Sequence, residues 1–467
     1  MEFTKILYAS SLMAMGLPAL VLAKAPTHPA KPNVLIILAD DAGYNDFGFM
    51  GCKDLETPNI DALSRQGVVF TDGHVASTVS SPSRACLITG RHGQRFGYEC
   101  NLNAHTNGLP LSEQTLGDIF RNGGYRTAAV GKWHLGYLPQ FHPNRRGFDY
   151  FYGMLSGSRE YFYNEKGSDK LGDGDNLLVN DKRIKFEGYL TDRFTDQAIE
   201  VIEEQSDKPF MLYLAYNAVH TPMQALPEDL ARYKGHPRQK LAAMTYALDR
   251  GVGRVVEALK KNGKFDNTLI YFLSDNGGAT TNTSSNYPLK GFKGNKFEGG
   301  HRVPFFVVWN GTIPGGKHYD GMVSSLDIAA TSVDAADIKV TENPLDGVSL
   351  LPYLLKGKKG NPHETLYWRK MATRAIRQGD YKLIITQGVD SVMYNLKEDP
   401  QEMNNLIHKE PKIYRKLAKQ LQRWENNECV TPLWIEEGWA HITNGIHERL
   451  MHNEAKEAKD FRNKKKK

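Results

Sequence analysis

Four apolar segments of the chain are each followed directly by side chains that can bind metals or transfer protons. NVLIILA is followed by Asp40 and Asp41, YRTAAVG by Lys132 and His134, FMLYLAYNAV by His220, and TLIYFLS by Asp275 and Asn276. In an open parallel sheet, ligands bind just beyond the carboxyl ends of the strands. One such aspartate or histidine would be explained as a helix cap or a structural residue. Because the pattern recurs at four segments, we expect these side chains to meet at one edge of a sheet.

The acidic and amide side chains of this group indicate a hard divalent cation. Asp40, Asp41, Asp275 and Asn276 supply only oxygen ligands, and no cysteine or histidine stands among them. Oxygen ligands favour Ca²⁺ or Mg²⁺ over zinc.

The remaining polar residues suit an anionic substrate. Lys132, Arg84, His134 and His220 combine cationic donors with two titratable rings, which fit anion binding and acid–base work. A divalent cation beside such donors would stabilise the transition state of a sulfate or phosphate ester, in which charge spreads over several oxygens.

The segment SSPSRACLITGR, residues 80–91, predicts a short helix that starts at a serine. Pro82 is favoured in a first helical turn and Gly90 at a helix end. Ser80 would then lie at a helix N-terminus, where backbone N–H groups favour negative charge. On the pattern alone, a helix cap is the default interpretation of Ser80.

Apolar β-branched runs alternate with amphipathic segments along the chain, which predicts an α/β fold. The predicted strands are NVLIIL, YRTAAV, FMLYLAY, TLIYFL and VPFFVV, and the predicted helices include TLGDIFRNG, RFTDQAIEVIEEQ and LDRGVGRVVEALKKNG. This alternation is typical of a mostly parallel central sheet covered by helices on both faces. A Gly-, Lys- and Pro-rich stretch predicts a boundary near residue 360. We expect a catalytic domain over 26–360 and a small α+β subdomain over 361–467, with the strands YKLII and VMYNL and a helix over 411–427.

The N-terminus predicts an exported protein. Lys5 precedes an apolar run to Ala23, and Ala23-Lys24-Ala25 resembles a cleavage site, so we expect a signal peptide over 1–25 and a periplasmic or secreted location. No later run is long enough to span a membrane. The four cysteines include no CxxC pair, and one or two disulfides would suit an exported protein.

The net charge gives no indication of a nucleic-acid partner. The chain of 467 residues carries a formal charge of +6, but the basic tail Lys464–Lys467 contributes four of these charges. The rest of the chain is close to balanced, which argues against nucleic-acid binding.

The chain resembles the type I sulfatases, the formylglycine-dependent members of the alkaline phosphatase superfamily. Their signature is Cys or Ser, any residue, Pro-Ser-Arg, three variable residues, an aliphatic residue and Thr-Gly-Arg, which Ser80–Arg91 matches throughout. NVLIILADDAGYND, TPNIDALSRQGVVF, GYRTAAVGKWHLG, NRRGFDYFYG, VHTP, LSDNGG and KGFKGNKFEGGHRVP resemble further family blocks in the same order. RQGDYKLI and MYNLKEDPQEMNNL resemble the family's C-terminal subdomain.

The resemblance implies that Ser80 is oxidised to Cα-formylglycine (3-oxoalanine). A serine at this position implies the serine-type subgroup, which a radical-SAM maturing enzyme modifies before export. A plain serine would be left as a stable sulfate ester, whereas an aldehyde hydrate can expel sulfate by breaking its C–O bond.

The resemblance also implies a role for each site residue. Asp40, Asp41, Asp275 and Asn276 would hold Ca²⁺, or alternatively Mg²⁺, together with residue 80. Arg84 and Lys132 would orient the hydrate and the sulfate, His134 would remove the proton that triggers sulfate release, and His220 would act as general acid. Lys293 would bind the sulfate, with Lys290 and Lys296 as nearby competitors. His301 and Cys86 are expected to be structural.

The resemblance is strongest to bacterial carbohydrate sulfatases, so the expected partner is a sulfated glycan, with galactose or N-acetylgalactosamine sulfate favoured. Candidate specificity residues, in the loops between the shared blocks, are His105, Arg159, Tyr161, Trp439 and His441. Two alternatives stay open: a phosphodiesterase or phosphonate hydrolase of the same superfamily, and a non-catalytic protein that binds sulfated glycans.

Overall fold

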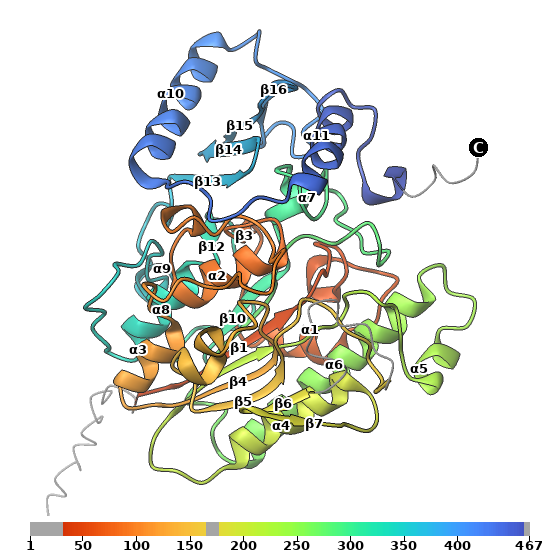
Figure 1. Cartoon of the computed structure of the whole chain (residues 1–467), viewed down its shortest axis with the longest axis vertical. Coiled ribbons are helices and arrows are strands. Elements are labelled where there is room, and N and C mark those ends of the chain that lie inside the picture. Colours follow the sequence, from red (N-terminus) through yellow and green to blue (C-terminus); the bar gives the residue numbers. More distant parts are fainter. Residues whose placement is uncertain (1–30, 165–176, 462–467) are drawn as a thin grey trace, which may run out of the picture. The chain divides into compact units, whose positions relative to one another are not determined.

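The computed structural model describes residues 31–164 and 177–461 (Figure 1). The predicted signal peptide and the basic tail lie outside the described residues, so both remain expectations. The described residues belong to one compact unit. Among the described residues, no helix has the length and apolarity needed to cross a membrane.

A ten-stranded sheet, mostly parallel at its centre, forms the core and confirms the predicted fold class (Figure 1). Its strands, in spatial order, are β11 (Lys317–Tyr319), β2 (Val68–Phe70), β10 (Phe305–Val308), β9 (Thr268–Ser274), β1 (Asn33–Ala39), β8 (Phe210–Ala215), β4 (Arg126–Lys132), β5 (Tyr150–Met154), β6 (Leu177–Val179) and β7 (Lys182–Ile184). The five strands from β9 to β5 are parallel, whereas β10 pairs antiparallel with β9 and with β2, and β6 pairs antiparallel with β5 and with β7. The five apolar runs identified in the sequence form β1, β4, β8, β9 and β10.

Helices cover both faces of this sheet because its central strands are apolar on both sides. On β1, Leu35 and Ile37 belong to one buried cluster, and Val34, Ile36 and Leu38 belong to another. The first cluster packs under α1 (Pro58–Ser64), α4 (Leu190–Glu203), α5 (Pro227–Arg232) and α6 (Gln239–Lys261). The second packs under α2 (Ser80–Thr89), α3 (Leu116–Asn122), α8 (Asp327–Ala335) and α9 (Leu351–Leu355). Alternate residues of one strand thus anchor opposite helical layers.

A second, antiparallel sheet is formed near the C-terminus by β13 (Thr365–Lys370), β14 (Thr373–Gln378), β15 (Tyr381–Thr386) and β16 (Asp390–Asn395). Helix α10 (Pro411–Glu428) packs on one face through Leu417 and Leu421. Helix α11 (Glu437–Met451) packs on the other face through Leu450 and Met451. The expected domain boundary near residue 360 stays a prediction, and the second sheet begins just beyond it.

Short elements complete the fold. They are β3 (Gly73–His74), β12 (Val323–Ser324), α7 (Glu298–His301) and the 3-10 helices η1 (Gly48–Met50), η2 (Gly93–Arg95), η3 (Pro139–Phe141), η4 (Pro143–Arg145) and η5 (Ala458–Phe461). All four cysteines are free, so the expected disulfides do not form in this structure. Cys86 is completely buried, as expected, and its Sγ accepts a hydrogen bond from the Gly93 amide at 3.1 Å.

Candidate active site

The polar residues that follow the central strands meet at one edge of the sheet, as their positions in the sequence predict. Parallel pairing aligns Ala39 with Ser274, so Asp40 and Asp275 lie side by side just beyond β1 and β9. The Asp41 amide donates to Asp275 Oδ1 at 3.2 Å. The three carboxylates therefore form one buried acidic cluster.

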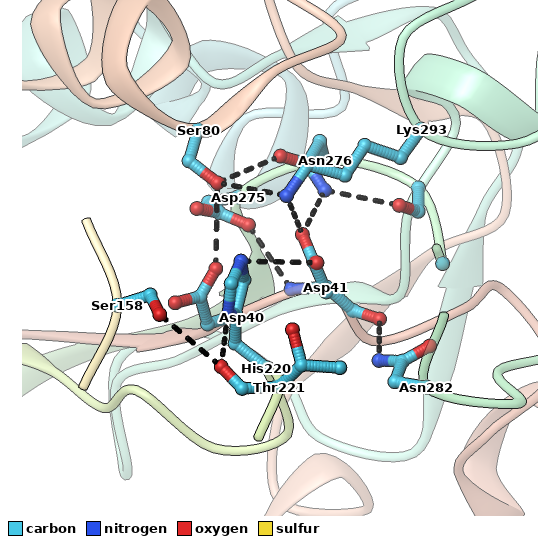
Figure 2. Close-up of polar contacts among 12 residues, drawn as sticks. Asp40, Asp41, Ser80, Ser158, His220, Thr221, Asp275, Asn276, Asn282 and Lys293 are labelled. Carbon is cyan, nitrogen blue, oxygen red and sulfur yellow. Dashed lines mark hydrogen bonds and ion pairs between the residues drawn. The ribbon is translucent and has the colours of Figure 1, made fainter. Parts of the chain in front are cut away.

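Ser80 faces this cluster from the first residue of α2. Val79 is the N-cap, and the Ser80 hydroxyl makes no cap hydrogen bond, so the interpretation of Ser80 as a helix cap is wrong. Its Oγ donates to Asn276 Oδ1 at 3.1 Å and lies 3.4 Å from Asp40 Oδ1. Gly90 ends the helix in the left-handed conformation, as predicted. The Ser80 side chain, at the start of the helix, thus contacts the side-chain oxygens of Asp40 and Asn276 and does not bind the helix backbone (Figure 2).

Two buried cations neutralise the acidic cluster from the side of β4 and α2. Lys132 Nζ lies 2.6 Å from Asp40 Oδ2. Arg84 donates Nε to Asp275 Oδ2 at 3.0 Å, and Nη2 lies 2.8 Å from the same oxygen. Its Nη1 donates to the Lys132 carbonyl at 3.1 Å. Arg84 therefore ties α2 to the ends of β4 and β9.

Lys293 is a third cation in contact with the cluster. Its Nζ lies 2.6 Å from Asp41 Oδ1 and 3.5 Å from Ser80 Oγ. Asn276 Nδ2 donates to the same Asp41 oxygen at 2.8 Å (Figure 2). Lys290 instead contacts the Glu402 carbonyl and Asn453, and Lys296 donates to Thr78. Of the three lysines, Lys293 is thus the one that reaches Ser80.

The Asp41 backbone is held in an uncommon conformation by residues that the sequence analysis did not identify. Its φ is 60°, in the left-handed region that non-glycine residues seldom adopt. Its carbonyl accepts hydrogen bonds from Asn282 Nδ2 and from Ser284 Oγ, both at 2.9 Å. These two residues belong to the polar segment TTNTSSN, which shows no motif that would have marked them.

The carboxyl groups fit a divalent cation. Burial and, after it, repulsion from the Asp275 carboxylate raise the pKa of Asp40 to about 7. Burial also opposes ionisation of Asp41, but the Lys293 ammonium holds the pKa of that carboxyl well below its usual range. Three buried carboxyls and one amide oxygen, without sulfur, form a donor set of the kind that Ca²⁺ and Mg²⁺ prefer.

The two histidines follow different strands of the sheet, His134 after β4 and His220 after β8. His134 follows β4 with φ 59°, and its Nδ1 is buried with no hydrogen-bond partner in the described part of the chain. A Cβ added at Gly157 would lie 2.4 Å from His134 Nε2, so this ring packs tightly on the glycine. Burial, assisted by the Lys132 charge, holds the pKa of His134 well below its usual range.

His220 follows a cis peptide between Ala218 and Val219. Its Nδ1 lies 2.6 Å from the Thr221 carbonyl and therefore donates, and its Nε2 lies 3.6 Å from Asp41 Oδ2. Burial lowers the pKa of His220 to about 4, although the Asp41 carboxylate opposes this shift. Both rings are consequently neutral at neutral pH in the protein without substrate.

A cavity of about 600 Å³ opens beside the cluster. Asp41, His220 and Lys293 line one side, and residues of α11 line another. A ligand bound in the cavity can therefore contact the acidic cluster and α11 at the same time.

Comparison with known proteins identifies the family. Residues 32–338, more than half of the chain, match the sulfatase family model, and residues 293–427 match the model for N-sulphoglucosamine sulphohydrolase, C-terminal. The chain belongs to the sulfatase family. This sulfatase is therefore a sulfuric ester hydrolase, which disfavours the phosphodiesterase, phosphonate hydrolase and non-catalytic alternatives.

Similarity to curated and solved proteins extends over most of this sulfatase. The uncharacterized sulfatase YdeN of Escherichia coli (strain K12) is 37% identical over 395 residues, which cover 72% of this chain and 68% of the relative. The N-acetylgalactosamine-6-sulfatase of Mus musculus is 33% identical over 398 residues, covering 80% and 75%. The crystal structure of Ps i-CgsB has a TM-score of 0.82 at 37% identity and covers 89% of this chain and 98% of that one. Ps i-CgsB in complex with k-i-k-neocarrahexaose matches with a TM-score of 0.81 at 36% identity, covering 90% and 99%.

Of the five candidate specificity residues of this sulfatase, Trp439 alone lines the cavity. His105 stacks on Tyr137, and the Arg159 guanidinium lies over the Phe186 ring. His441 is exposed on α11 and points away from the lining face.

Tyr161 is a buried structural residue and not a specificity residue. Its hydroxyl donates to the carbonyl of Asn217 at 2.6 Å and lies 2.9 Å from that of His220. It thus holds the segment that carries His220. The loop segment LSGSREYFYNE, in which Tyr161 stands, gave no indication of this packing role.

His301 is structural, as expected, and is part of a fully buried polar network. Its Nδ1 lies 3.0 Å from His74 Nδ1, and its ring stacks on Trp368 with centroids 3.9 Å apart. Lys382 Nζ lies 3.0 Å from His301 Nε2. His74, Glu298 and His301 have metal-ligand geometry, but the adjacent Lys382 and Arg377 already supply positive charge to this network.

Proposed function

We propose that this sulfatase removes sulfate from a sulfated glycan, with residue 80 as the nucleophile after Ser80 has been converted to formylglycine. The observation that carries the proposal is the placement of Ser80 Oγ, 3.1 Å from Asn276 Oδ1 and 3.5 Å from Lys293 Nζ, beside an open cavity. A nucleophile held between oxygen ligands and an ammonium can attack an anionic ester whose charge is already neutralised.

A bound Ca²⁺ would polarise the sulfate oxygens and lower the barrier to attack. Asp40, Asp41, Asp275 and Asn276 would hold it together with the residue-80 oxygen, since these are the buried oxygens around Ser80. Mg²⁺ is the alternative, because it takes the same ligand types.

Cationic side chains would bind and orient the sulfate. Lys293 is one-fifth exposed and lines the cavity, so its ammonium can leave Asp41 and contact a sulfate oxygen. Lys132 and Arg84 are completely buried, and they orient residue 80 by fixing Asp40 and Asp275. Their charges also stabilise negative charge that develops on the transferring group.

The two histidines suit opposite proton transfers. His134 is neutral and its Nδ1 lacks a partner among the described residues, so this nitrogen is available as a base, and the proposal assigns it the proton of the residue-80 side chain. His220 is neutral in the free protein because burial lowers its pKa to about 4. Its role as general acid requires that the negative charge of the bound ester raises that pKa.

A galactose or N-acetylgalactosamine sulfate is the proposed sugar. Support comes from the similarity to Ps i-CgsB, which was crystallised with k-i-k-neocarrahexaose, and to N-acetylgalactosamine-6-sulfatases. The proposed setting is export through the N-terminal apolar segment, after modification of Ser80 by a radical-SAM maturing enzyme.

Sulfate release from defined sugars tests this function. Protein coexpressed with a maturing enzyme should release sulfate from a galactan or N-acetylgalactosamine sulfate, and Ser80→Ala should lose that activity while remaining folded. Excess chelator should abolish release, and added Ca²⁺ should restore it. Unchanged activity in Ser80→Ala would refute the nucleophile, and full activity in chelator would refute the metal.

A further inference from the structure

Helix α11 presents one continuous face to the cavity beside the acidic cluster. The lining residues of this helix are Trp439, Ile442, Thr443, Ile446 and His447. Spacings of three and four residues place all of them on the same side of a helix. We call this set the α11 face.

The outer half of the α11 face is apolar and uncovered. Trp439 is 59% exposed and Ile442 is 48% exposed. Further along the helix, Leu450 and Met451 are buried against the C-terminal sheet. An apolar helix face normally packs against the protein, so the uncovered half at an active-site cavity is suited to a ligand.

The inner end of the face provides a hydrogen-bond acceptor. His447 Nδ1 lies 2.8 Å from the Thr443 carbonyl and therefore donates to it. The ring is neutral, because burial lowers its pKa to about 3, so Nε2 carries a lone pair. This Nε2 is buried and has no hydrogen-bond partner within the described parts of the chain. A hydroxyl donor from a ligand would satisfy it.

Charge is distributed unequally between the two sides of the cavity. Lys293 lines the side beside the acidic cluster, where an anionic group is expected. On the α11 side, Lys370 Nζ lies 2.7 Å from Glu436 Oε2, so these two charges neutralise each other. The group that contacts α11 is therefore uncharged, and it needs an apolar surface together with hydroxyls. A pyranose ring has both.

We propose that the α11 face is a sugar-binding subsite, in which Trp439 stacks on a pyranose ring of the glycan and His447 accepts a hydrogen bond from a sugar hydroxyl. The subsite rests on the proposed function, because the sulfate of the same glycan must reach residue 80. It assigns the recognition of the sugar to the C-terminal part of the chain, whereas the chemistry lies at the edge of the large sheet.

Binding to a catalytically inactive protein tests the subsite independently of turnover. Calorimetric titration of Ser80→Ala with neocarrahexaose and with an N-acetylgalactosamine 6-sulfate disaccharide should detect binding of at least one of them. Adding Trp439→Ala should weaken that binding about tenfold, and Trp439→Phe should weaken it less, because Phe retains an aromatic face. His441→Ala is the matched control, since His441 is exposed on the same helix outside the lining face.

A second variant isolates the proposed acceptor. His447→Asn can keep the donor to the Thr443 carbonyl while removing the Nε2 lone pair, and it should weaken oligosaccharide binding about threefold to tenfold. Circular dichroism and melting temperature establish that each variant is folded.

Turnover separates a failed subsite from a failed function. In the matured enzyme, Trp439→Ala should lower the ratio of kcat/KM for the oligosaccharide to that for 4-nitrophenyl sulfate about tenfold. An unchanged ratio with unchanged binding would overturn the subsite, as would binding of neither oligosaccharide to Ser80→Ala. Absence of sulfate release from every substrate would instead refute the proposed function, while the binding comparison would still decide on the subsite.

Discussion

Lys132 Nζ lies 2.6 Å from Asp40 Oδ2, and both side chains are completely buried. The pair joins the end of β4 to the end of β1. Asp40 also lies 3.4 Å from Ser80 Oγ, so a cation on one strand controls the charge beside the proposed nucleophile. Removing a single partner from a buried ion pair leaves an uncompensated charge.

Lys132→Met should therefore reduce sulfate release by on the order of a hundredfold or more, because a preorganised charge beside the reacting group is lost. Ca²⁺ should raise the melting temperature of this variant more than that of the wild type, because the acidic cluster of the variant has lost the positive charge of Lys132. Activity assays and melting curves with and without Ca²⁺ measure both effects. Wild-type activity in Lys132→Met would contradict the role of the pair.

Gly157 provides a test of the His134 position. An added Cβ would lie 2.4 Å from His134 Nε2, so Gly157→Ala should displace the ring and lower kcat by about tenfold or more. Gly445→Ala is the control, because a Cβ at that position meets no atom within 4 Å. Equal activity of the two variants would show that the position of the His134 ring is not critical.

Lys382 should be important for stability rather than for turnover. Its Nζ lies 2.9 Å from Glu298 Oε1 and 2.9 Å from Glu402 Oε1, and all three side chains are completely buried. Lys382→Met should lower the free energy of unfolding by about 3–5 kcal/mol, because Glu402 loses the cation that it pairs with and Glu298 loses one of its cations. Lys459→Met removes a lysine that is 68% exposed and should cost less than about 1 kcal/mol. Chemical denaturation compares the two, and similar losses would refute the buried-network interpretation.

Asp249 should make stability depend on pH. Its carboxylate accepts hydrogen bonds from the Asn59 and Ile60 amides at the start of α1, at 3.2 and 2.8 Å. Burial raises its pKa from 3.8 to about 6, so between these values the folded protein keeps a proton that the unfolded chain has lost. Its contribution to stability therefore falls as pH rises from about 4 to about 6, by about 3 kcal/mol.

Asp249→Asn lacks this titration. The melting temperature of the wild type relative to Asp249→Asn should decline across that pH range and become constant above it. A difference that does not change with pH would show that Asp249 does not titrate with a raised pKa.

The sequence was sufficient to predict the sheet and the residues at its edge, because central strands are continuously apolar and the polar residues follow them directly. The LDRGVGRVVEALKKNG helix is the C-terminal part of α6, which begins at Gln239. The earlier part of α6 was not predicted; burial of residues such as Leu241 and Met244 in the first cluster stabilises it as a helix.

Contacts between distant segments could not be predicted. Tyr161 was a candidate specificity residue, yet its hydroxyl donates to the carbonyl of Asn217, which lies 56 residues away in the sequence. Of the α11 face, only Trp439 was a candidate from the sequence. Ile442, Ile446 and His447 follow it at helical spacing but were not predicted. The spacing marks one helical face but does not reveal that this face borders the active-site cavity.

The mass of the tryptic peptide over residues 66–84 shows directly whether Ser80 has been converted to formylglycine. The peptide should be taken from protein produced in its native host. We expect a loss of about two mass units relative to the encoded serine peptide, the mark of a carbonyl nucleophile at residue 80. An unmodified serine in protein that releases sulfate would contradict it.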